Sequence, residues 1–190
     1  GIVSEKDKDL IVDYIDIDLP KSGLYKNQMM MLDILANNDW KRPIYFTGGS
    51  YNDSEYIWMK DYLQLDGLVY KLVPIQTKIS KENPYELGRI DSELMYNIVR
   101  GWEWGNAQSP DIYHDPETRK NSISFRGNLH RLAEKLIEDG EYEKSEKILD
   151  LSLEKMPLEY FGFYSLVEPY ISTYYSLGLF EKGDSLYKQL

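Results

Sequence analysis

The sequence predicts an α+β fold, with a small strand-bearing part in residues 1–88 followed by a helical part in residues 89–190. Short runs of β-branched and aromatic residues that end at glycine or proline occur in the first part. Apolar residues spaced three and four positions apart fill the second part. The chain has 190 residues, of which 42% are hydrophobic, which is enough for a packed core. Because no long flexible linker separates the parts, we expect them to pack as one compact body.

In the first part, the segment 10–19 ends in strict alternation of apolar and other residues, which predicts a half-exposed strand closed by Pro20. Residues 24–37 predict a helix with an apolar stripe made of Tyr25, Met29, Leu32 and Ala36. Further along, the sequence predicts a strand at 44–47 ended by Gly48-Gly49-Ser50, a short helix at 61–65, a strand at 68–74 and a polar connection at 75–88.

The second part opens with a predicted helix at 91–104 and a loop at 105–114. Asp115 and Pro116 then supply an N-cap and a first-turn proline for a long helix. Its apolar face leads to a turn at Gly140 and to a second helix, which ends before Pro157. The inner faces of this hairpin comprise Leu129, Leu132, Ala133 and Leu136 on one helix and Tyr142, Ser145, Leu149 and Ser152 on the other.

This hairpin resembles a tetratricopeptide repeat, in which small residues let two helices approach and an aromatic residue at the turn plugs the gap. Ser145 and Ser152 replace the alanines usual there. A second copy follows at Ile171, Tyr174, Tyr175, Gly178, Phe180, Gly183 and Tyr187. The separation of Gly140 and Gly178 slightly exceeds the ideal period of about 34 residues, and we place the surplus in the loop around 157–162. Since a free-standing solenoid needs roughly three repeats, these two should lean on the preceding chain or on something outside it.

Composition excludes several function classes. A net charge of −10 argues against a nucleic-acid-binding surface. The lack of cysteine excludes disulfides, thiolate metal sites and cysteine nucleophiles. No apolar run approaches the roughly 18 residues of a membrane span. The two histidines, His114 and His130, have no ligand-like spacing, so we predict neither a metal site nor a cofactor.

Several residues are nonetheless candidates for binding, and none is a candidate for catalysis. An arginine beside a tryptophan or a helix start can clamp a carboxylate or phosphate, or it can form an internal salt bridge. Tryptophan rings can stack on a sugar or pack in the interior. His114, in a loop beside Asp115, is the better site candidate of the two histidines. The candidate binding residues are Trp40, Arg42, Tyr45, Tyr70, Trp102, Trp104, His114 and Arg119.

Five stretches carry a wider resemblance, namely 32–35, 38–46, 61–74, 102–105 and 115–119. They resemble the soluble C-terminal part of a bacterial family of large multi-spanning membrane proteins, long described only as a domain of unknown function. The N-terminal half of that family is similar to protein O-mannosyltransferases. The chain is then expected to be a piece of a longer protein, a lipid-linked-sugar glycosyltransferase whose catalytic residues lie in the membrane half.

The resemblance implies that this chain is a non-catalytic accessory and protein-interaction domain, not itself an enzyme. It would hold a protein partner, an acceptor polypeptide or a glycan on the periplasmic side of the bacterial inner membrane, and meet the membrane only through the absent N-terminal region. Two alternatives stay open. One is a carbohydrate-binding module with an aromatic cleft at Trp102, Trp104, Tyr70 and Tyr45. The other is a glycoside hydrolase-like enzyme with two carboxylates about 5–9 Å apart.

Overall fold

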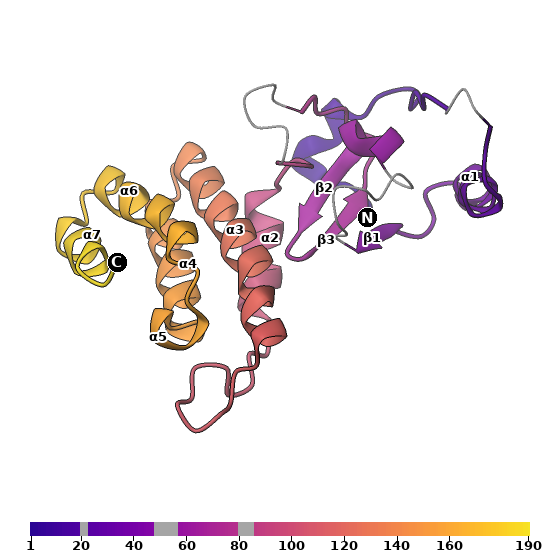
Figure 1. The fold of residues 1–190 in the computed structure, drawn as a ribbon. Coiled ribbons are helices and arrows are strands. Elements are labelled where there is room, and N and C mark those ends of the chain that lie inside the picture. The colour runs from indigo at the N-terminus through magenta and orange to yellow at the C-terminus, as the bar shows by residue number, and fades with distance from the viewer. Residues whose placement is uncertain (20–22, 48–56, 80–85) are drawn as a thin grey trace. The chain divides into compact units, whose positions relative to one another are not determined.

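The computed structural model describes residues 1–19, 23–47, 57–79 and 86–190. Internal contacts divide the chain into two compact units, Gly1–Asp91 and Ser92–Leu190. A three-stranded antiparallel sheet lies in the first unit, and the second unit is helical in its regular structure (Figure 1). The predicted α+β fold class is therefore confirmed.

The N-terminal unit is built around the sheet, whose strand order is β1-β3-β2. Gly67 and Leu68 join β2 to β3 in a two-residue turn, and Gly67 has a φ of 73°. A positive φ at the first position of such a turn favours glycine. The elements are the 3₁₀-helix η1 (Glu5–Leu10), α1 (Lys26–Asn38), β1 (Tyr45–Thr47), the 3₁₀-helix η2 (Ile57–Tyr62), β2 (Leu63–Asp66) and β3 (Val69–Leu72).

Three predictions for this unit are confirmed, since α1, β1 and β3 form where the sequence placed a helix and two strands. The predicted short helix at 61–65 is wrong. Its first residues end η2 and the rest form β2, because pairing across the turn at Gly67 outweighs a weak local preference for helix. The described residues of the polar connection at 75–88 are irregular, as predicted, and Gly48-Gly49-Ser50 lies outside the described residues.

The predicted strand at 10–19 is also wrong. Leu10 ends η1, and the described residues after it are extended without belonging to a sheet. This segment is fastened by individual bonds, with the Val12 amide donating to the Pro74 carbonyl at 2.9 Å. The alternation still sets the burial, because Ile15 and Ile17 are half-buried while their neighbours are exposed. The alternation therefore correctly indicated which side chains of this segment face the core. It did not show whether a neighbouring strand was available for the segment to pair with. The predicted closing residue, Pro20, lies outside the described residues.

The face that helix α1 turns to the core overlaps only partly with the predicted stripe, of which Leu32 is half-buried. Met31 and Leu35 pack against the cluster of Met59, Tyr62 and Leu72, whereas Tyr25 and Met29 are exposed. Gln28 is buried and its side-chain oxygen accepts from the Tyr25 amide at 2.9 Å, which caps the helix. The first half of the predicted stripe, Tyr25 and Met29, is wrong because α1 carries apolar residues on more than one face.

In the helical unit, α3 packs on α4, α6 packs on α7, and α2 lies against α3 (Figure 1). The first helix ends at Arg100, shorter than the predicted 91–104, and the predicted loop and the Asp115 cap follow as expected. The elements are α2 (Ser92–Arg100), α3 (Pro116–Glu138), α4 (Tyr142–Lys155), α5 (Leu158–Phe161), the 3₁₀-helix η3 (Tyr164–Leu166), α6 (Glu168–Ser176) and α7 (Phe180–Tyr187).

Two helical hairpins, α3–α4 and α6–α7, are thus present where the sequence predicted them. Ser145 and Ser152 are fully buried between helices. Tyr142, which was expected to plug the gap at the turn, is instead 60% exposed. It occupies the first residue of α4 and does not belong to the buried stripe of that helix. The surplus residues between the hairpins form α5 and η3.

Candidate functional site

The N-terminal unit contains an apolar hollow of about 370 Å³. Three parts of the unit enclose it: the extended segment after η1, the inner side of α1 with Trp40, and the core beside the sheet. Its lining is Val12, Asp13, Tyr14, Ile15, Ile17, Leu32, Leu35, Ala36, Trp40, Met59, Leu72 and Pro74. The volume is that of an ordinary ligand pocket, and an almost wholly apolar wall suits an apolar side chain.

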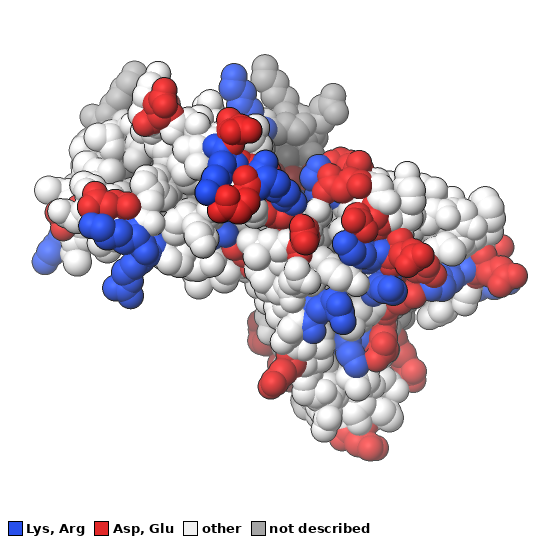
Figure 2. All heavy atoms as spheres, turned by 180° about the vertical axis from the view of Figure 1, so that it is seen from behind, with Lys and Arg blue, Asp and Glu red and all other residues white. Residues whose placement is uncertain are grey.

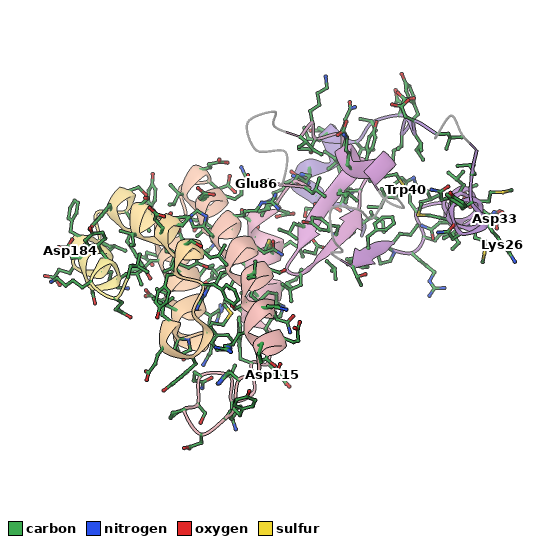
Figure 3. The ribbon with its side chains drawn as sticks, viewed as in Figure 1. Lys26, Asp33, Trp40, Glu86, Asp115 and Asp184 are labelled. Atoms are coloured by element: carbon green, nitrogen blue, oxygen red, sulfur yellow. The ribbon has the colours of Figure 1, made fainter. Side chains whose placement is uncertain are left out.

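Trp40 reaches this hollow through an unusual backbone. Asp39 and Trp40 have φ values of 48° and 54°, so the chain reverses through two consecutive residues in the left-handed region. Each such non-glycine residue costs roughly 1–2 kcal/mol, and such strain is often found at binding sites. Trp40 is 42% exposed and lies on the side of α1 that faces the sheet, while Lys26 and Asp33 lie on the outer side (Figure 3).

Beyond the hollow, the outer side of α1 is also rich in apolar residues. Met29, Met30 and Ile34 are 60%, 57% and 56% exposed, and Tyr25 before them is 77% exposed. Monomeric proteins seldom keep several large apolar side chains together in solvent without a binding role. The hollow is therefore the candidate site for an apolar partner, and the outer side of α1 is a second, separate apolar surface on the opposite face of that helix.

The other predicted residues of this unit do not line the hollow. Arg42 is exposed and, among the described residues, forms no ion pair. Tyr45 lies on β1 opposite Lys71, and burial together with the Asp66 carboxylate raises the pKa of its hydroxyl. Tyr70, paired with Phe46, lies on the other face of the sheet from Tyr45, and it is not among the residues that line the hollow. Of the four candidates in this unit, the structure brings only Trp40 to the hollow.

A buried polar network crosses the same unit, and the sequence analysis missed it. Lys71 Nζ lies 3.1 Å from Asp66 Oδ2, and the Gln64 amide donates to Asp66 Oδ1 at 2.8 Å. Arg89 extends the network by donating to Gln64 Oε1 at 3.1 Å and to Asp7 Oδ2 at 2.8 Å. Polar residues at alternate positions of two otherwise apolar strands were the available signal. The network ties β2 and β3 to the chain on either side of the sheet.

In the helical unit, Trp102 and Trp104 follow α2 and are half-buried. Their ring centroids lie 5.4 Å apart, and Phe125 of α3 lies 5.4 Å and 5.6 Å from them. Edge contacts of this kind fix the orientation of the indoles. Trp102 and Trp104 belong to a different unit from Tyr45 and Tyr70, and the aromatic cleft that combines all four stays a prediction.

His114 and Arg119 have different surroundings. His114 is buried, with Nε2 2.7 Å from the Ala107 carbonyl, to which it donates when that nitrogen is protonated. Its ring stacks on Tyr160 at 5.7 Å and meets the edge of Phe161 at 4.8 Å. These contacts fasten the loop before α3 to α5. Arg119 is exposed in the first turns of α3.

Arg126 is a fully buried cation that the sequence analysis also missed. Its guanidinium donates to the carbonyl of Met156 at 2.8 Å and to that of Gly162, at the ends of α4 and α5. The Tyr170 hydroxyl donates to the Arg126 carbonyl at 2.8 Å. Burial lowers the pKa of this guanidinium. Arg126 therefore joins three helix ends to the middle of α3.

Two further properties bear on function. In residues 1–19, 23–47, 57–79 and 86–190, no three His, Asp or Glu side chains gather to hold a metal ion. Within the same ranges, neither the long helix α3 nor a shorter one is apolar enough over a sufficient length to cross a membrane.

Residues 1–94 match the family model described as TMEM260-associated domain 2. No curated protein and no solved structure matches the chain. The matched residues include the whole unit that holds the hollow and the first residues of α2. The first half of the chain is thus similar to a domain associated with an O-mannosyltransferase-like membrane protein family, TMEM260.

Proposed function

We propose that the chain is a non-catalytic interaction domain of an O-mannosyltransferase-like membrane protein, and that it holds a polypeptide while the membrane-embedded part of that protein transfers the sugar. The observation that supports this is the apolar hollow beneath α1, which lies within the residues that match the TMEM260-associated domain. The polypeptide is an acceptor or a partner subunit, held at the periplasmic side of the membrane.

The lining of the hollow favours a polypeptide over a sugar. Sugar hydroxyls need several donors and acceptors, but among the lining side chains only Asp13, Tyr14 and Trp40 carry a polar group. A large aliphatic or aromatic side chain needs only apolar walls, and burying one contributes about 1.5–3 kcal/mol. The exposed methionines on the outer side of α1 offer the polypeptide a second contact surface, because unbranched thioether side chains adapt to partners of different shape.

The helical unit would serve the same function as a rigid support. We propose that α3–α4 and α6–α7 are tetratricopeptide-like repeats, which present extended surfaces to polypeptides. The fully buried Ser145 and Ser152 support this, because small residues at these positions let the paired helices pack closely.

The test uses the full-length membrane protein with a charge placed at the rim of the hollow. Ala36 lines the hollow, whereas its neighbour Asn37 is exposed and bonds to Asp33. We expect Ala36→Glu to raise the KM for a polypeptide acceptor about tenfold with kcat unchanged, since only binding is weakened. Asn37→Glu adds the same charge one residue later on the same helix, and the KM should not change.

Two results would overturn the proposal. One is an acceptor KM that is the same in Ala36→Glu as in the unaltered protein. The other is sugar transfer by the purified 190-residue chain alone, which would make the domain catalytic.

A further inference from the structure

The helical unit contains a second concave site, a groove of about 480 Å³ between α2, the segment after it, and α4. Its walls come from two helices and from the tryptophan pair. The lining residues are Tyr96, Val99, Arg100, Trp102, Trp104, Lys147, Ile148, Leu151 and Lys155. The proposed function does not use this groove.

The groove is positively charged although the chain as a whole carries a net charge of −10. Its lining includes Arg100, Lys147 and Lys155 but no carboxylate. In the described part of the chain, Arg100 and Lys147 form no ion pair, and Lys155 pairs only with the exposed Glu154, at 2.7 Å. Clustered cations without carboxylates raise the local concentration of anions.

Cations elsewhere on the surface have different surroundings. Basic and acidic side chains lie next to one another over much of the face drawn in Figure 2. Lys182, for example, lies 2.7 Å from Glu146 and 2.6 Å from Asp150. Such pairs satisfy each other, whereas Arg100 and Lys147 still have their charge available for a ligand.

The rest of the groove is apolar and aromatic. Val99 and Ile148 are buried beneath it, and the indoles of Trp102 and Trp104 border it. The Tyr96 hydroxyl is the only side-chain hydrogen-bond acceptor in the lining, because the three cations and the two indoles only donate. A neutral sugar would find one acceptor here for all of its hydroxyl protons, whereas an anion with an apolar body needs only donors and apolar walls.

We infer that this groove binds an acidic peptide segment that carries a large apolar side chain between its carboxylates. The inference deepens the proposed interaction function and rests on it for the choice of a peptide as ligand. Lys147 and Lys155 lie two turns apart on α4, a separation of about 12 Å along the helix. An extended peptide spans that distance in about four residues. The ligand should therefore have acidic residues three or four positions apart, with the apolar residue between them.

The test measures the fluorescence anisotropy of a labelled peptide, mixed with the purified chain, in which two glutamates four positions apart flank a phenylalanine. We expect binding that weakens with salt. Lys147→Glu should raise the Kd by at least about fivefold, because an exposed ion pair contributes up to about 1 kcal/mol. Lys188→Glu is the matched control, because Lys188 is exposed at the end of α7, far along the chain from the groove residues, and should leave binding unchanged.

Three outcomes would overturn the inference. The peptide fails to bind, Lys188→Glu weakens binding as much as Lys147→Glu, or an oligogalacturonate binds more tightly than the peptide and displaces it. The last would make the groove a site for an anionic glycan. Since the assay involves neither the hollow nor the membrane part, its failure leaves the proposed function in place. Ala36→Glu should have no effect in it.

Discussion

Removing one partner of the buried ion pair between Lys71 and Asp66 should strongly destabilise the small sheet. The two side chains are 6% and 4% exposed, with 3.1 Å between Nζ and Oδ2. Lys71→Met keeps a similar side-chain volume but removes the charge. The Asp66 carboxylate is then left with the Gln64 amide at 2.8 Å as its described hydrogen-bond donor. Removing one partner of a buried pair costs about 3–5 kcal/mol, because the other charge stays buried without compensation.

A matched exposed pair separates the effect of burial from that of distance. Lys120 lies 2.7 Å from Glu117 on α3, with side chains 57% and 79% exposed. Lys120→Met should cost less than about 1 kcal/mol, because water screens this pair and solvates the remaining carboxylate. Distance alone would predict the larger cost for the closer pair, so the two variants distinguish the explanations.

The assay is equilibrium unfolding in urea, combined with hydrogen exchange of peptides covering 63–73 and 116–138 to localise each loss. A double variant, Lys71→Met with Asp66→Asn, should recover much of the lost stability, because the neutral amide still accepts from Gln64 and no charge is buried alone. The reasoning is refuted if Lys71→Met costs no more than Lys120→Met, or if the double variant is less stable than Lys71→Met.

Two further predictions concern the backbone and pH. Gly88→Ala should destabilise the folded chain more than Gly140→Ala does in thermal unfolding. Both glycines have a positive φ, 76° at Gly88 and 79° at Gly140. A Cβ atom at Gly88 would lie 3.2 Å from the Leu63 carbonyl oxygen, whereas one at Gly140 would meet nothing within 4 Å. The opposite order would contradict the steric argument. Burial raises the pKa of Tyr170, so above about pH 10 its hydroxyl ionises in the unfolded chain while it stays protonated in the folded one, and stability falls. Urea unfolding between pH 7 and 11 should show a shallower decline in Tyr170→Phe, and an equal decline would count against this role.

Local signals predicted most of the helical unit. Asp115 and Pro116 mark the start of α3 because their side chains act within one turn: Asp115 Oδ1 accepts from the Glu117 amide at 2.9 Å and from the Thr118 amide at 3.1 Å. Glycine marks the end of the same helix, where Gly140 adopts a φ of 79°. Such features need no knowledge of the rest of the fold, which is why the helical hairpins were predictable.

Features that depend on distant residues were not predictable in the same way. The segment 11–19 has the alternation of a strand, but whether it joins a sheet depends on a neighbour with free backbone groups. Arg126 sits on a helix face that the periodicity marks as buried, yet the carbonyls that accept from it belong to residues 30 and 36 positions away. The Asp66-Gly67 pair between two short runs was a usable signal for a hairpin at this point, although the loop in the structure is Gly67-Leu68, one residue later.

The candidate binding residues also divide into those that a local sequence signal marks and those that depend on residues far away in the sequence. Trp40 was predicted as a binding residue beside Arg42, and in the structure it borders the hollow, while its role in binding stays a prediction. Lys147 was not predicted, because nothing in its own helix distinguishes it from other exposed lysines. Its importance comes from Arg100, on a helix that lies next to α3 and lines the same groove.

The two sides of α4 explain why this groove is suited to binding. On one side, the Ser145 hydroxyl donates to the Ala133 carbonyl at 2.9 Å, and Ser152 lies 2.9 Å from the Tyr170 hydroxyl. The alanines usual in a tetratricopeptide repeat could form neither bond, so the serines fix α4 more firmly than the repeat pattern requires. On the adjacent side, Lys147 lines the groove. A helix that is already fixed loses little conformational freedom when a peptide binds, so more of the contact energy appears as affinity.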